Sequence, residues 1–253
     1  MKNMNTILAV GAVSAVCGAA QADVIAAWDF QTTTNGGTAL AAAPAMPKVI
    51  TANFGAGTIY LDGTNGSSNF FQPASGNTNT EINAFGGTSV NANATIGMST
   101  VTSGASALAI AGGLTPSGGS PAANGKSMVF KFSMSNLANL SISYATQRTS
   151  TGFNSQVLEY STDGISWSSI GSNTSIQSSF SASASPAAVV TSFSTSGLDG
   201  VSVAYVRMTL TGATNSSGNN RFDNFIFSAD AVPSPGALAL LGVAGLVTSR
   251  RRK

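Results

Sequence analysis

Strict alternation of apolar and polar residues is the feature that most constrains how this chain can fold. It recurs in "KSMVFKFSM" (residues 126–134), "LSISY" (140–144) and "VSVAYVRMTLTG" (201–212). Successive side chains of a β-strand point to opposite faces, so each segment is expected to form a strand with one buried face. The expected buried residues are Met128, Phe130, Phe132, Met134, Leu140, Ile142, Tyr144, Ala204, Val206, Met208 and Leu210. The opposite faces carry Val129, Lys131, Ser133, Tyr205, Arg207 and Thr209.

Other strand candidates are spread along the chain between turns rich in Gly, Ser, Asn and Pro. They are Val24–Phe30, Thr58–Leu61, Ala107–Ala111, Val189–Phe193 and Phe222–Phe227. Residues 23–230 contain no segment with a helical period and no interdomain linker. Many short strands of this kind predict an all-β fold, an antiparallel β-sandwich of the jelly-roll type, as one domain over residues 23–230.

One β-hairpin is predicted with particular clarity, in "VLEYSTDGISWSSIG" (157–171). Asp163-Gly164 favours a two-residue type I′ turn, in which both central residues have positive φ. Such a turn would place Tyr160 opposite Trp167 and Leu158 opposite Ser169.

The hairpin resembles the Tyr-Ser-x-Asp-Gly-x-x-Trp hairpin of discoidin (coagulation factor type C) domains, and "AYVRMTL" looks like the strand that follows it there. This resemblance implies the galactose-binding-like jelly roll. The chain ends its last strand as "RFDNFIF" and not in that family's usual way. From this resemblance we therefore expect the family's architecture in this chain, and not its binding loops.

Charge and composition exclude several classes of function. Charged residues make up 8% of the chain, and residues 23–230 hold nine acidic and six basic residues, a formal charge of −3. No basic patch points to nucleic acid. The chain has no histidine, which excludes the Ser-His-Asp triad and the usual zinc ligand sets. Glycoside hydrolysis needs two carboxylates that face one cleft. No acidic pair stands out around Glu81, and Glu159 lies mid-strand beside the Asp163 turn, so we expect no enzyme.

The first 22 residues have the order of a secretory signal peptide. Lys2 supplies the positive charge, Ile7–Ala20 is apolar, and Ala20-Gln21-Ala22 is a small-residue cleavage site. The mature chain is then expected to begin at Asp23. The one cysteine, Cys17, would be removed with the signal, so no disulfide is expected.

The last residues, 231–253, combine prolines, an uncharged stretch and terminal cations. A helix from Gly236 to Ser249 would be about 21 Å long, against a hydrocarbon core of about 30 Å, which makes it a short transmembrane span. The terminal Arg cluster and Lys253 would stay on the cytoplasmic side and stop transfer.

This tripartite tail resembles the PEP-CTERM sorting signal, which implies processing by an exosortase-like enzyme near the prolines. The residues that carry the resemblance are Val232, Pro233, Ser234, Pro235, Arg250, Arg251 and Arg252. Ser234 stands where that class has Glu. The implied route is general secretion, a transient stay in the inner membrane, and then the cell surface or extracellular matrix. The alternative is a plain C-terminal membrane anchor.

Two sites are hypothesised on the sandwich. Jelly-roll modules often hold a structural Ca²⁺ near their first and last strands through carboxylate and carbonyl oxygens. Asp29, Asp223 and Asn224 occupy those strands here, and the alternative is that they are ordinary strand-end residues. For a sugar ligand, the candidates are Arg148, Phe153 and Tyr205, because exposed rings stack on sugar faces and Arg reads hydroxyls. Trp28 and Trp167 are expected to pack in the core and in the hairpin.

These features favour an exported structural or adhesive matrix protein with no catalytic role. The alternative is a carbohydrate-binding module of the same architecture, with a polysaccharide as partner. A secreted glycoside hydrolase comes third.

Overall fold

The structure is a computed structural model that describes residues 22–32, 37–40, 46–71, 84–87, 90, 93–95, 97–99, 107–114, 121–178 and 189–232. Residues 1–21 of the predicted signal peptide, with Cys17 among them, lie outside these residues, as do Glu81 and the tail from Pro233 onward. The described residues form thirteen β-strands. Among them no helix is long and apolar enough to cross a membrane.

Two antiparallel sheets make up the fold. The first has seven strands, with β11, β8, β13, β1 and β3 side by side and β6 and β5 continuing from β13. Their bounds are β1 (Asp23–Trp28), β3 (Phe54–Gly55), β5 (Ala84–Gly87), β6 (Ala107–Ala111), β8 (Leu137–Arg148), β11 (Val189–Thr195) and β13 (Asn219–Ala231). The last strand, β13, therefore lies between β1 and β8.

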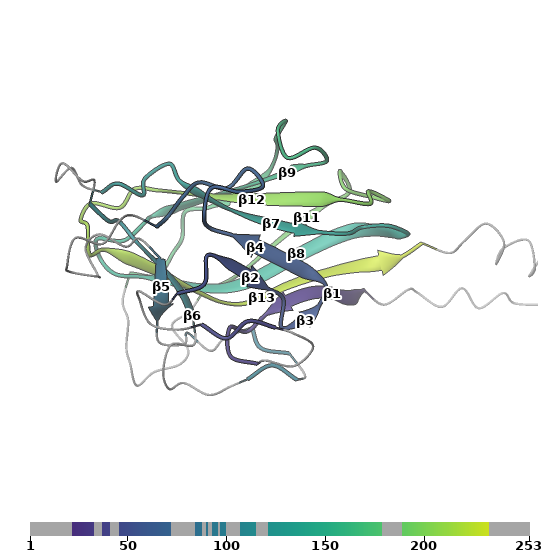
Figure 1. The fold of residues 1–253 in the computed structure, drawn as a ribbon, viewed down its shortest axis with the longest axis horizontal. Coiled ribbons are helices and arrows are strands. Elements are labelled where there is room, and N and C mark those ends of the chain that lie inside the picture. Colours follow the sequence, from purple (N-terminus) through teal and green to yellow (C-terminus); the bar gives the residue numbers. More distant parts are fainter. Residues whose placement is uncertain are drawn as a thin grey trace, which may run out of the picture.

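The second sheet has six strands in the order β10-β9-β12-β7-β4-β2. Their bounds are β2 (Val49–Thr51), β4 (Gly57–Tyr60), β7 (Ser127–Phe132), β9 (Ser155–Ser161), β10 (Ser168–Asn173) and β12 (Ala204–Thr211). In Figure 1, β9 and β12 lie in one layer of the molecule and β13 and β1 lie in the other.

Aromatic side chains from both sheets meet in the core. The ring centroid of Phe130, on β7, lies 5.5 Å from that of Trp28, 4.9 Å from that of Phe225 and 5.0 Å from that of Phe227. All four residues are at most 1% exposed. The antiparallel β-sandwich predicted from the alternation is confirmed, and so is every buried residue predicted in the three alternating segments.

The hairpin of β9 and β10 differs from its prediction. Ser168, and not Trp167, lies opposite Tyr160, and the register shifts between Ser169 and Gly171. Within Asp163-Gly164 only Gly164 has a positive φ, 73°, so the type I′ turn is wrong.

Side chains explain the wider loop that joins these two strands. The Ser161 hydroxyl accepts hydrogen bonds from the backbone N–H of Asp163 and of Gly164, at 3.2 and 2.8 Å. The Asp163 carboxylate accepts from the backbone N–H of Ile165 and of Ser166, both at 2.8 Å. These bonds, with that from Ser161, hold the pKa of Asp163 below its ordinary value. The loop thus satisfies its own backbone donors without a tight turn.

Candidate functional site

The outer face of the six-stranded sheet gathers aromatic and charged side chains on β7, β12 and β9. Tyr205 pairs with Lys131 on one side and with Ser161 on the other. Two residues further along β12, Arg207 pairs with Val129 and with Glu159. Directly opposite residues of paired strands share a face. The alternation of β12, with Ala204 to Leu210 buried at every second position, turns Tyr205 and Arg207 outward.

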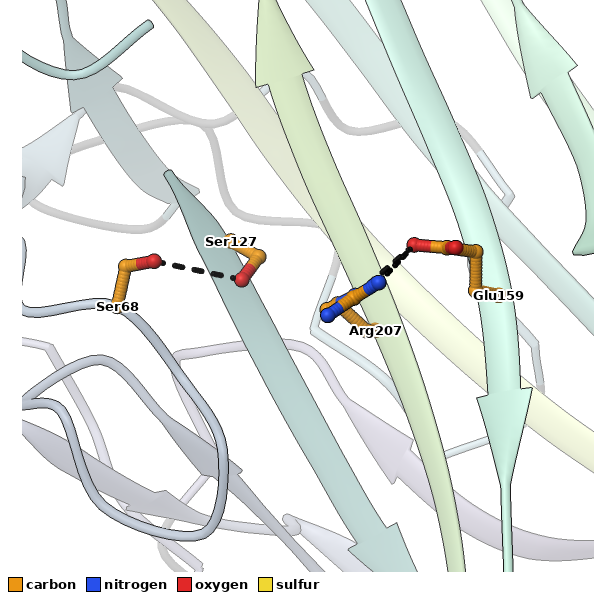
Figure 2. A network of polar contacts seen from close by, with 4 residues as sticks. All are labelled: Ser68, Ser127, Glu159 and Arg207. Carbon is orange, nitrogen blue, oxygen red and sulfur yellow. Dashed lines mark hydrogen bonds and ion pairs between the residues drawn. The ribbon is translucent and has the colours of Figure 1, made fainter. Parts of the chain in front are cut away.

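Arg207 is held in a defined plane on this face. Its Nε and Nη2 donate to Glu159 Oε2 at 2.9 and 2.6 Å, and the two side chains are 26% and 23% exposed. Figure 2 shows this pair crossing from β12 to β9. The Trp167 ring lies over the guanidinium, with its centroid 4.3 Å from Arg207 Cζ. A guanidinium that is stacked on a ring and paired with a carboxylate loses little further freedom when it binds a ligand.

Tyr205 lies beside a cation and against the hairpin loop. Lys131 Nζ is 5.7 Å from the Tyr205 ring centroid and 3.3 Å from Asn65 Oδ1. A Cβ placed on Gly164 would come within 3.6 Å of the Tyr205 ring, so the hairpin loop passes directly beside that ring. The ring itself is half-buried.

The loop 62–71 lies over the outer side of β7. Ser68 N donates to Ser127 O at 2.9 Å, and the hydroxyl oxygens of these two residues are 3.5 Å apart (Figure 2). Two residues before Ser68, a Cβ on Gly66 would lie 3.5 Å from the Trp167 ring. Val129, which pairs with Arg207 on one side and with Tyr60 on the other, points outward on β7 and is nevertheless fully buried. The loop and the hairpin thus frame the half-buried rings of Tyr205 and Trp167.

This arrangement suits non-covalent recognition of a polar, ring-containing ligand. Half-buried Tyr and Trp rings present an apolar face with a polar edge, and a fixed Arg–Glu pair offers both donors and acceptors. Hydrolysis would need a second carboxylate facing Glu159 across a cleft. The Glu159 carboxylate already accepts two hydrogen bonds from Arg207.

Of the three ligand residues predicted from sequence, Tyr205 alone lies on this face. Phe153 is fully buried in the core cluster, so its prediction as an exposed stacking residue is wrong. Arg148 ends β8, in the other sheet, and its guanidinium donates to the backbone carbonyls of Ile176, Thr149 and Ser150. Arg148 therefore anchors loops. The three residues do not come together.

Sequence reasoning placed Lys131 and Arg207 on the polar side of their strands but did not connect them with a site. The missing information was the strand order. Arg207 and Glu159 are 48 residues apart, and only the pairing of β12 with β9 brings them together. Trp167 was expected to pack within the hairpin, opposite Tyr160. In the observed register Ser168 takes that position, and the Trp167 ring stacks on Arg207.

The predicted calcium residues lie on or directly after two neighbouring strands of the seven-stranded sheet, β1 and β13. Trp28 pairs with Phe225, which brings Asp29 next to the 223–224 segment. Asp29 is fully buried, and its carboxylate accepts from the backbone N–H of Gln31, Thr32 and Ser99, at 3.1, 2.9 and 3.0 Å, and from the Thr32 hydroxyl. A carboxylate has about four acceptor positions, so Asp29 has none left for a cation.

Asp223 is the carboxylate on which the calcium prediction now rests. It is fully buried, and it accepts from Val90 N at 3.1 Å and from Asn224 N at 2.9 Å. Asn224 is one of the few non-glycine residues with a positive φ, 45°. The part of the chain that the structure describes holds no group of three or more acidic, histidine or cysteine side chains placed to bind a metal. Calcium stays a prediction.

We expect Ca²⁺ to raise the melting temperature if Asp223 binds it, because an ion that binds only the folded state stabilises that state. The measurement compares thermal unfolding in millimolar CaCl₂ with that in EDTA. Mg²⁺ at the same concentration controls for ionic strength. Equal melting temperatures in calcium and in EDTA would show that the prediction of a calcium site is wrong.

Comparison with known proteins finds only distant structural likeness. The sequence matches no protein-family model and no curated protein. The structure is similar to a family 29 carbohydrate-binding module from Piromyces equi, at a TM-score of 0.33 and 11% identity, over 52% of this chain and 73% of that one. It is also similar to the K1 cleaved adhesin domain of Lys-gingipain from Porphyromonas gingivalis W83, at a TM-score of 0.33 and 10% identity, over 49% and 74% of the two chains. At these scores the likeness does not bear on what this chain binds.

Proposed function

We propose that the sandwich is a non-catalytic carbohydrate-binding module of the jelly-roll type, which binds a polysaccharide on the outer face of β7, β12 and β9. The observation that carries the proposal is the pair of half-buried rings, Tyr205 and Trp167, beside the Arg207–Glu159 ion pair. The rings stack on the apolar faces of sugar residues. The charged pair and Asn65 donate to and accept from hydroxyl groups.

Replacement of Tyr205 with Ala is expected to weaken polysaccharide binding at least tenfold, because truncation of a central aromatic side chain at an interface commonly costs more than about 1.4 kcal/mol. Tyr205→Phe is the matched control. It keeps the ring and is expected to retain most of the affinity. Affinity electrophoresis against a panel of soluble polysaccharides measures the effect, and circular dichroism checks that each variant is folded. If the wild type and Tyr205→Ala bound a polysaccharide with equal affinity, the binding site would not include Tyr205.

A structural or adhesive role at the cell surface is the second candidate, and the sequence feature that favours it is the tail. In that role the chain is exported, cut near Pro233 and Pro235 by an exosortase-like enzyme, and released from the inner membrane to the surface or matrix. The two roles are compatible, because a matrix protein can hold its polymer through a binding face.

We expect Pro233→Ala with Pro235→Ala to block this processing and to leave full-length protein in the inner membrane. Prolines hold the preceding chain extended, which is the form that a protease accepts in its cleft. Mass spectrometry of surface-extracted protein tests this. A C-terminal peptide that still ends at Lys253 in the mature surface protein would make the tail a permanent anchor.

A further inference from the structure

Three lysines, two from the β7 segment and one from the residue before β2, lie beside the loop 62–71. Lys126, which precedes β7, donates from Nζ to Asn69 O at 2.6 Å. Lys131, within β7, reaches Asn65 Oδ1. Lys48, which precedes β2, has its Nζ 5.2 Å from the centroid of the Phe71 ring.

None of these lysines has a carboxylate partner within 4.0 Å among the described residues. The nearby acids are engaged elsewhere. Glu159 pairs with Arg207, and the Asp62 carboxylate accepts from the backbone N–H and the hydroxyl of Thr64. Half-burial lowers the pKa of Lys126, as expected of a cation that has lost water and gained no counter-charge.

These cations gather on one face, although the sandwich as a whole has a negative formal charge. Residues 23–230 carry a formal charge of −3, so an even distribution would favour repulsion of anions. Of the remaining described acids, Asp163 lies in the loop between β9 and β10 and accepts hydrogen bonds from the backbone N–H groups of Ile165 and Ser166. The others lie on or beside the seven-stranded sheet, and they are Asp23, Asp29, Asp199, Asp223 and Asp230. A separation of charge between two faces raises the local concentration of oppositely charged ligands at the basic one.

Each lysine also lies beside an aromatic ring. The rings are Phe71 for Lys48, Phe70 for Lys126 and Tyr205 for Lys131, with Nζ-to-centroid distances of 5.2, 5.9 and 5.7 Å. Phe70 is buried, whereas Phe71 and Tyr205 are partly exposed. At about 3.4 Å per residue, the Cα atoms of Lys126 and Lys131 are about 17 Å apart along the backbone. The repeated combination of ring and cation fits an extended polymer whose anionic groups recur along its length.

We propose that the ligand of this face is an acidic polysaccharide, a polymer of uronic acid residues with one carboxylate on each sugar. This inference rests on the carbohydrate-binding function proposed above. Sugar rings stack on Tyr205 and Phe71, and their carboxylates approach Lys131 and Lys48. A neutral polysaccharide would bury the Lys126 ammonium further without placing an anionic group beside it, and burial of an unpaired charge is unfavourable.

The test compares two polymers that share a backbone. Polygalacturonate carries free carboxylates, and its fully methyl-esterified form does not. Binding of the protein to each is measured by affinity electrophoresis and by calorimetry in EDTA, at low and at high NaCl. We expect binding to the free acid that weakens as salt rises, because salt screens exposed charges, and little binding to the ester.

Variants assign the effect to the lysines. Each of Lys48→Met, Lys126→Met and Lys131→Met is expected to weaken binding to polygalacturonate roughly two- to fivefold, the range of a single exposed ion pair. The matched Lys→Arg variants keep the charge and are expected to bind as the wild type does. Melting temperatures check that all six variants are folded.

The outcomes separate the two proposals. Equal affinity for the acid and the ester, or lysine variants that bind polygalacturonate as the wild type does, would overturn the acidic ligand and leave the carbohydrate-binding function standing. Binding to no polysaccharide would overturn both. Equally tight binding of double-stranded DNA would reduce the face to a general polyanion surface and would also overturn the inference.

Discussion

Replacing Phe130 with Ala is expected to lower the free energy of unfolding by about 3–5 kcal/mol, the range for truncation of a buried aromatic side chain. Phe130 extends from β7 in one sheet and contacts Trp28, Phe225 and Phe227, which all belong to the other sheet. Truncation would therefore open a cavity at the contact between the sheets. The chain has a single cysteine, so no disulfide within the chain would compensate.

Chemical denaturation measures this change, and Phe130→Leu is the matched control. Leu keeps most of the apolar volume and is expected to cost much less. The denaturant slope should stay the same if the native and unfolded states keep their compactness. A loss under about 1 kcal/mol in Phe130→Ala would mean that this ring does not lie between the two sheets.

Replacing Asp29 with Ala is expected to cost about 3 kcal/mol, although it removes only a short polar side chain. The carboxylate is the common acceptor for the backbone N–H groups of Gln31, Thr32 and Ser99 and for the Thr32 hydroxyl. Hydrogen bonds to a charged group are among the stronger ones, and donors that lose their acceptor in a buried place carry the full cost of desolvation. The Ser99 bond also ties a distant segment to the end of β1.

The matched control for Asp29→Ala is Asp62→Ala. Asp62 accepts from the N–H and hydroxyl of Thr64 in an exposed turn, so water can replace it, and we expect a change of about 0.5 kcal/mol. Both variants are measured by urea unfolding in EDTA, which keeps metal binding out of the comparison. Similar losses for the two variants would contradict the structural role of Asp29.

Several properties of the fold follow from the sequence alone, because the direction of a side chain on a strand depends only on its position. Alternation therefore assigned Phe130, Tyr144 and Met208 to the core, and Tyr205 and Arg207 to the other side, with no knowledge of neighbouring strands. It also predicted the all-β sandwich. The strands β2, β3 and β5 were not predicted, because β2 and β3 have only three and two residues, too few to display a period, and β5 reads Ala-Phe-Gly-Gly, which does not alternate.

The tertiary structure decided what the sequence could not, namely which faces meet and how the loops are filled. Phe153 lies in a segment whose sequence is typical of a polar loop, yet its side chain is buried in the core cluster. The hairpin register depends on side-chain caps at Ser161 and Asp163 that a two-residue turn does not need. The candidate site exists because β12 pairs with both β7 and β9, which places Lys131, Arg207 and Glu159 on one surface. Strand order is set by the packing of the whole core, and no local pattern of residues encodes it.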